Sequence, residues 1–176
     1  MELKIKFDSQ GALLSGKAPA IVQKNLDQAV TEVTQFLDGQ VKARTPQGAN
    51  GAQGGLLGSI QAPMPVEGKG TPLVKGVVMS AHPTAEVIEK GRKPGKGIAS
   101  AVPGDKYVSP LIPWINKKLG ISGKDAERIA YLIGRKIKAE GFEGAHMFEK
   151  ALTENWGTVQ GIFNRYGITI TQELNQ

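Results

Sequence analysis

The segment PAIVQKNLDQAVTEVTQFLDGQVKAR, residues 19–44, decides the fold class of this chain. Its apolar residues recur every three or four positions between Val22 and Val41, a spacing that places them on one face of an α-helix. At about 1.5 Å per residue, such a helix is about 37 Å long. Pro19 suits the first helical turn, whereas Pro46 cannot continue the helix. The sequence therefore predicts one long amphipathic helix near the N-terminus.

Strand-like segments lie on both sides of this helix. Apolar and polar residues alternate over residues 3–7, which is the period of a strand with one buried face. Residues 59–66 and 73–79 also predict strands, and residues 67–70 are the expected turn between them. The two prolines within 59–66 cannot donate to a β-ladder, so that strand is expected at a sheet edge or with an irregular course.

Helical periodicity returns in the C-terminal half. Residues 111–119 predict a helix that ends at Gly120, and Ser122 begins another with a pattern like a capping box. A last helix is expected from about 147 to 163, and residues 168–170 predict a short closing strand. This order predicts an α+β fold in which the long N-terminal helix packs on a small antiparallel sheet, with additional C-terminal helices.

Two long segments carry few residues to bury. The first, at about 47–57, is rich in glycine, and the second, at about 90–108, is rich in glycine, proline and lysine. Both are expected to be mobile loops. The chain length fits one modest core, so a single domain over residues 1–176 is expected.

Composition argues against an enzyme. The chain has no cysteine, and its only histidines, His82 and His146, are far apart and are expected to be surface or capping residues. No catalytic, cofactor-binding or metal-binding residue is therefore assigned, and no cofactor is expected. Trp114 and Trp156 lie within apolar helical stripes and are expected in the core. No run approaches the roughly 20 apolar residues that span a bilayer, so no membrane partner is expected.

The formal net charge of +6 points to a possible polyanionic partner. Cationic residues concentrate at 90–96, 117–118 and 135–138, and the last two groups are interpreted as solvated faces of the predicted helices. The alternative to a structural protein is thus a nucleic-acid-binding protein that uses the basic 90–106 loop. Specific binders usually add stacking aromatics or a recognition helix, and aromatic residues make up only 6% of this chain.

Several segments share a recognisable order. They are KARTP (42–46) followed by GGLLGSI (54–60), AEVIEKG (85–91), PWI and KKLG within 113–120, residues 133–137, and GFEGAHMFEKAL (141–152). GGLLGSI is similar to a Gly-x-Leu-x-x-Ser-Ile signature, and AEVIEKG is similar to an Ala-x-x-Val-Glu-x-Gly pattern. Together the segments resemble the bacteriophage tail-component family typified by phage HK-ninety-seven.

The resemblance implies a structural virion protein of a tailed bacteriophage. Such a protein acts in tail completion and head–tail joining at the neck, through contacts with a connector, tail terminator or tail tube. It implies assembly in the host bacterial cytoplasm, a place in the virion tail or neck, and an arrangement that includes a homo-oligomeric ring. DNA passes through such a structure without specific nucleic-acid binding.

The expected partner contacts fall on the two long loops. They comprise four basic residues of the second loop and two leucines of the first: Lys90, Arg92, Lys93, Lys96, Leu56 and Leu57. A Gly-rich basic segment loses conformational entropy when it docks, so a large or strongly complementary surface is needed to order it. An acidic ring of another virion protein would supply that surface.

Overall fold

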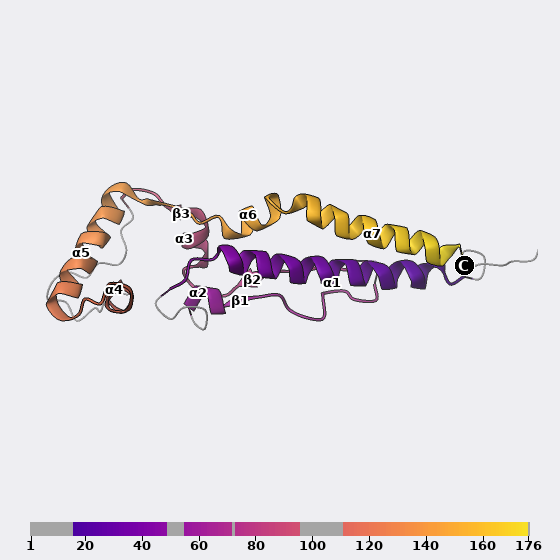
Figure 1. Cartoon of the computed structure of the whole chain (residues 1–176), viewed down its shortest axis with the longest axis horizontal. Coiled ribbons are helices and arrows are strands. Elements are labelled where there is room, and N and C mark those ends of the chain that lie inside the picture. Colours follow the sequence, from indigo (N-terminus) through magenta and orange to yellow (C-terminus); the bar gives the residue numbers. More distant parts are fainter. Residues whose placement is uncertain (1–15, 49–54, 72, 96–110, 176) are drawn as a thin grey trace, which may run out of the picture. The chain divides into compact units, whose positions relative to one another are not determined.

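The computed structural model of the chain describes residues 16–48, 55–71, 73–95 and 111–175 (Figure 1). These residues group into two compact units. The first unit holds the described residues of 1–39, 62–78 and 152–176, and the second unit holds those of 40–61 and 79–151. The single-domain expectation stays a prediction, because two compact units can belong to one folding domain. The expected strand at 3–7 lies outside the described residues.

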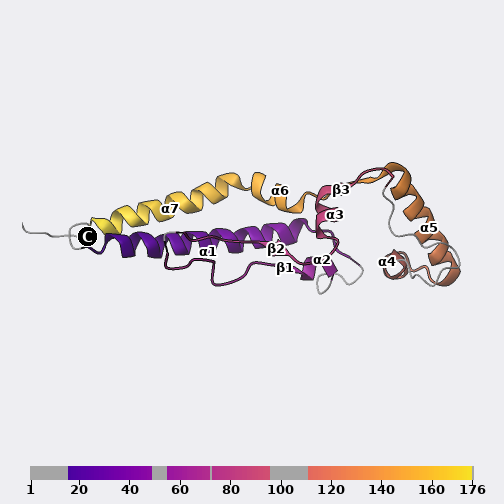
Figure 2. The same cartoon turned by 180° about the vertical axis from the view of Figure 1, so that it is seen from behind.

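Two long antiparallel helices, α1 (Ala18–Arg44) and α7 (Trp156–Leu174), dominate the first unit. Figures 1 and 2 show them side by side from opposite directions. Their shared core consists of aliphatic and aromatic side chains, namely Val33 and Leu37 of α1 with Val159, Ile162 and Tyr166 of α7. The predicted N-terminal helix is therefore confirmed, and its apolar stripe is buried against a helix from the other end of the chain.

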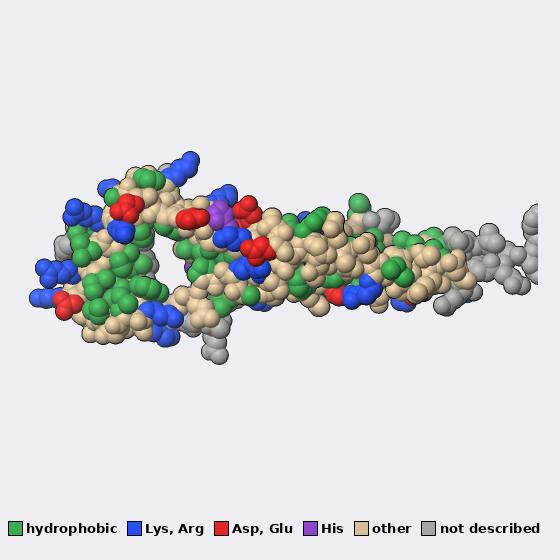
Figure 3. All heavy atoms as spheres, turned by 45° about the horizontal axis from the view of Figure 1, so that its top comes forward, with side chains coloured by type: hydrophobic (Ala, Val, Ile, Leu, Met, Phe, Trp, Pro, Cys, Tyr) green, Lys and Arg blue, Asp and Glu red, His purple; other side chains and the backbone are tan. Residues whose placement is uncertain are grey.

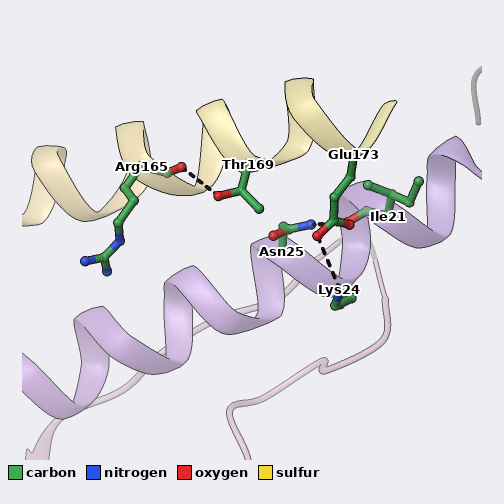
Figure 4. Close-up of polar contacts among 6 residues, drawn as sticks. All are labelled: Ile21, Lys24, Asn25, Arg165, Thr169 and Glu173. Atoms are coloured by element: carbon green, nitrogen blue, oxygen red, sulfur yellow. Dashed lines mark hydrogen bonds and ion pairs between the residues drawn. The ribbon is translucent and has the colours of Figure 1, made fainter. Parts of the chain in front are cut away.

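The buried side-chain amide of Asn25 links the N-terminal part of α1 to the C-terminal end of α7 (Figure 4). The side chain of Asn25 is almost fully buried, and its Nδ2 donates to the Ile21 carbonyl at 3.0 Å and to the Glu173 carboxylate at 3.3 Å. Lys24 Nζ lies 3.4 Å from the same carboxylate. Both amide protons of Asn25 are thus satisfied, which a buried polar group requires.

A second polar contact between α1 and α7 centres on Glu32. Its carboxylate accepts a short hydrogen bond from the Arg165 guanidinium and another, at 3.0 Å, from the Tyr166 hydroxyl. The hydrogen bond from Arg165 is the main reason that the pKa of Glu32 lies below its usual value. Burial, together with the bond to Glu32, raises the pKa of Tyr166. Glu32 is therefore a charged partner for two adjacent residues of α7.

Residues 62–78 complete the first unit along α1. Glu67 and Lys75 pair as an antiparallel bridge, with reciprocal backbone hydrogen bonds of 2.9 and 3.0 Å, so the expected reversal of the chain at 67–70 is confirmed. The N–H of Gly70, in the turn, donates to the Asp27 carboxylate of α1 at 2.9 Å. Regular pairing does not extend through 59–66, consistent with the prolines that cannot donate within that stretch.

The second unit begins with a short helix and a two-stranded sheet. Helix α2 (Gly55–Gly58) leads into β1 (Ile60–Gln61), which pairs antiparallel with β2 (Met79–Ser80). The Ser59 and Ser80 hydroxyls, beside this pair, lie 2.6 Å apart. The strands predicted at 59–66 and 73–79 thus pair regularly over only two residues each, at 60–61 and 79–80.

A second sheet joins parts of the chain that are distant in sequence. Helix α3 (Ala85–Lys90) runs into β3 (Gly91–Arg92), which pairs antiparallel with β4 (Phe142–Glu143), and α6 (Met147–Thr153) follows β4. Within the described residues the fold therefore has a long N-terminal helix, two small antiparallel sheets and several C-terminal helices. The predicted α+β class is confirmed.

Helices α4 (Leu111–Leu119) and α5 (Gly123–Glu140) form a hairpin within the second unit. Ile115 of α4 packs against Ala126 and Ala130 of α5, and all three are fully or almost fully buried. Trp114 is partly buried against this cluster, in agreement with its expected core role. The predicted helix start at Ser122 is confirmed, but the expected capping hydrogen bond is not, because the Ser122 side chain makes no such bond.

The C-terminal helix differs from the prediction in three respects. The single helix expected from about 147 to 163 is two helices, α6 and α7, and α7 continues to Leu174. Residues 168–170 belong to α7 and not to a strand. Ile170 lies three helical turns after Val159, on the face that packs on α1, whereas Ile168 is exposed. Trp156, expected in the core, lies at the first position of α7 with about half of its surface exposed. Packing against α1 thus overrides the strand preference of β-branched residues.

Candidate partner-binding surface

The predicted basic loop begins with ordered structure. Lys90 is the last residue of α3, and its Nζ donates to the Glu86 carboxylate at 2.8 Å, one helical turn earlier. This bond, between two exposed side chains, lowers the pKa of Glu86 and raises that of Lys90. Lys90 is therefore paired within its own helix before any partner arrives.

Arg92 lies in β3, opposite Phe142 of β4, and its side chain is partly buried. Lys93 follows it and is exposed. Two residues further on, the Gly95 N–H donates to the Lys138 carbonyl of α5 at 2.8 Å. The expected loop from about 90 therefore begins with regular structure, because Lys90 ends α3 and residues 91–92 form β3, whereas its mobility stays a prediction. Lys96 and residues 97–108 lie outside the described residues.

Glycines allow the close backbone approach that makes this sheet. Gly91 has a φ of +75°, and a Cβ at this position would overlap the carbonyl oxygen of Phe142 and the N–H of Gly144. A Cβ at Gly144 would overlap the carbonyl oxygen of Glu89. No side chain can be accommodated at either position without moving the main chain. Segments 85–91 and 141–152 therefore fit together only because both carry glycine where they touch.

Glu89 links the same two segments through its side chain. Its carboxylate accepts the N–H groups of Phe148 and Glu149, each at 3.1 Å, in the first turn of α6. These N–H groups have no partner within the helix, and the positive end of the helix dipole favours a carboxylate there. The main chain adds hydrogen bonds from Ala145 to Ile88 at 2.7 Å and from His146 to Glu89 at 3.1 Å. We call this arrangement of 85–92 with 141–149 the Glu89 junction.

His146 adopts a backbone conformation that is uncommon for a residue with a side chain, with a φ of 51°. Its Nδ1 lies 2.9 Å from the Glu149 carboxylate, one turn into α6. The sequence interpretation missed this pair, although the spacing of three residues was visible. His82 has a comparable place before α3, where its Nδ1 lies 2.8 Å from the Thr84 hydroxyl. Both histidines thus stand at helix starts, as expected of capping residues.

The two leucines of the expected contact set occupy α2. Leu56 is buried, and its side chain belongs to the core of the second unit, so its role as a partner contact stays a prediction that needs this side chain to become exposed. Leu57 is partly exposed and stays a candidate contact. The carbonyl of Leu56 also accepts the Ser59 hydroxyl at 2.7 Å, which fixes the end of α2. The prediction of a loop through 57 is wrong at 55–57, and residues 49–54 lie outside the described residues.

No family model matches the chain, and no curated protein or solved structure matches it. In the part of the chain that the structure describes, no group of three or more His, Cys, Asp or Glu residues is arranged to hold a metal ion. None of the described helices is both long enough and apolar enough to cross a membrane.

Proposed function

We propose that the chain is a structural virion protein of a tailed bacteriophage, which acts in tail completion and head–tail joining at the neck through protein–protein contacts. The observation that carries this proposal is the Glu89 junction. AEVIEKG and GFEGAHMFEKAL, two of the segments that resemble the phage tail-component family, pair with each other across about 50 residues of sequence.

Residues of the two segments have mutual structural roles. Glu89 caps the helix that begins within the second segment, and Gly91 and Gly144 permit the contact of the two backbones. Each pattern alone is common among unrelated proteins. The contact between the two segments supplies a physical reason for them to occur together in one chain. It therefore supports a fold similar to that of the phage tail-component family.

The partner surface in this proposal is the exposed start of the basic segment. Lys93 is exposed and lies directly after β3. The chain is held on both sides of it, by the pairing of β3 with β4 and by the hydrogen bond from Gly95 to α5. A cationic side chain on an ordered backbone loses less conformational entropy on docking than one on a flexible loop. An acidic surface of a neighbouring virion ring is the expected partner.

Deletion of the gene from the phage that encodes it tests the role. Electron microscopy of the lysate should show filled heads and tails that are not joined, or tails with defective ends. Plasmid expression of the wild-type chain should restore joined particles. Normal infectious particles in the deletion lysate would overturn the proposal.

A charge-reversal variant tests the surface. Arg92→Glu/Lys93→Glu should fail to restore joined particles, with a Tm near that of the wild-type chain if the β3–β4 pairing is kept. Lys69→Glu/Lys75→Glu makes the same change of charge at exposed positions in the first unit and should complement fully. Equal complementation by both variants would contradict a role for the basic segment.

A further inference from the structure

The outward face of α5 carries a row of cationic side chains. Residues at spacings of four, three, four and three positions share one face of a helix, and in α5 these are Lys124, Arg128, Tyr131, Arg135 and Lys138. All five side chains are exposed. In the space-filling view, Lys and Arg side chains project from the left-hand edge of the α4–α5 hairpin, beside a field of hydrophobic side chains (Figure 3). We call the five residues the cationic ridge.

The opposite face of α5 is already occupied. Ala126 and Ala130 are buried against Ile115 of α4, with Ile129 and Ile133 partly buried beside them. The helix therefore has its apolar side in the hairpin core and its cationic side in solvent. Because Ala126 and Ala130 face α4, this side of α5 is not free to enter a lipid interface, which makes a membrane the less favoured partner.

Within the described residues, no carboxylate pairs with a cation of the ridge. No carboxylate stands at any of the five positions, and Glu140 lies within ion-pair distance of Lys136, off the ridge, at 3.8 Å. Among the residues that the structure describes, none of the ridge cations makes an ion pair. Residues 111–140 hold seven Lys or Arg and three Asp or Glu, so this hairpin carries a net +4 of the formal +6 of the chain.

We propose that the cationic ridge binds the phosphate backbone of duplex DNA without preference for base sequence. From Lys124 to Lys138 the ridge extends over about 21 Å, at about 1.5 Å per residue. The major groove of B-form DNA is about 12 Å wide, so cations near the two ends of α5 can reach phosphates on both sides of the groove. The Tyr131 hydroxyl can donate to a phosphate oxygen between them.

The composition of the ridge favours DNA over a protein partner. The buried centres of protein interfaces are depleted of charged residues, whereas four of the five ridge residues are cations. Duplex RNA fits less well, because its major groove is deep and too narrow for side chains to read. This site goes beyond the proposed virion role, and its end at Lys138 adjoins the basic segment through the hydrogen bond from the Gly95 N–H.

Salt dependence gives a quantitative test with the purified full chain and a short fluorescent duplex. If each of the four cations neutralises one phosphate, log K falls with log salt at a slope of about −3.6. The affinity then drops about 150-fold between about 50 and 200 mM salt. Two duplexes of unrelated sequence should give the same affinity, and a tenfold preference for either would contradict backbone binding.

A pair of matched variants locates the site. Arg128→Gln/Arg135→Gln should halve the slope to about −1.8, so that the affinity drops only about 12-fold over the same range. Lys117→Gln/Lys118→Gln removes the same charge from exposed positions of α4 and should keep a slope close to that of the wild-type chain. Circular dichroism checks that both variants keep their helical content.

Besides a preference for one duplex, two outcomes would overturn the proposal. The first is the absence of DNA binding by the wild-type chain at about 50 mM salt. The second is an equal slope for the ridge variant and the α4 variant, which would show that net charge and not the ridge governs binding. In that second case, an acidic protein surface becomes the better occupant of the ridge.

Discussion

Replacement of Glu89 by alanine should measure the contribution of the Glu89 junction to stability. The carboxylate of Glu89 is partly buried and accepts two N–H groups of α6, each at 3.1 Å. Loss of a side-chain cap at a helix start costs about 0.5–2 kcal/mol. Because the two bonds go to a charged acceptor, we expect the upper part of that range, about 1–2 kcal/mol. For a chain of this size, the corresponding fall in Tm is about 2–8 °C.

Thermal unfolding followed by circular dichroism at neutral pH provides the assay. Glu86→Ala is the matched control, since Glu86 lies one turn earlier on α3 and pairs only with exposed Lys90 among the described contacts. It should leave the Tm unchanged within error. Glu89→Gln keeps one acceptor oxygen and should lie between wild type and Glu89→Ala. Equal Tm values for Glu89→Ala and Glu86→Ala would refute the assignment of Glu89 as the cap of α6.

Two further predictions concern the glycines and the pH dependence of stability. Gly144→Ala should lower the Tm, because the added Cβ would overlap the Glu89 carbonyl. Gly161→Ala, at a position of α7 with open space around it, should raise the free energy of unfolding by about 0.5–1 kcal/mol. A rise in Tm for both variants would contradict the close approach at Gly144. The hydrogen bond from Arg165 holds the pKa of Glu32 below its usual value. The charged Glu32 carboxylate therefore stabilises the fold fully at pH values above its ordinary pKa of about 4.3, and this stabilisation is lost as the pH falls through the lower pKa of the folded state. The Tm difference between wild type and Glu32→Gln should therefore narrow as pH drops below about 4, and a constant difference down to acid unfolding would exclude this linkage.

Long periodic segments account for the part of the fold that the sequence predicts. Helix α1 spans more than seven turns, so its apolar stripe repeats often enough to identify the helix and its length. Helices α4 and α5 were predicted for the same reason, and Gly120, with a φ of +69°, separates them as expected. In each of these helices, local spacing and tertiary packing agree.

The strands show why the rest could not be predicted. Strands β3 and β4 are two residues each, which is too short for an alternating pattern, and their pairing joins residues about 50 positions apart. The glycines at 91 and 144 signal a turn in the sequence, but only the structure shows that each makes room for the other segment. For this reason the start of the basic segment was predicted as a loop.

The structure distinguishes the basic residues at 90–92 from the cations of α5 by the contacts that each group already makes. Lys90 is already paired with Glu86, and Arg92 is partly buried in a sheet, so binding of phosphate by either must first disrupt contacts that exist. The four cations of the ridge make no ion pair among the described residues, so their charge is available to a polyanion. Between these two candidate DNA-binding sites, electrostatic attraction to DNA therefore favours α5 over the first part of the 90–106 segment. Arg92→Gln/Lys93→Gln should accordingly leave the salt slope of DNA binding close to that of the wild-type chain, and a slope reduced as far as in Arg128→Gln/Arg135→Gln would return the nucleic-acid site to the basic segment.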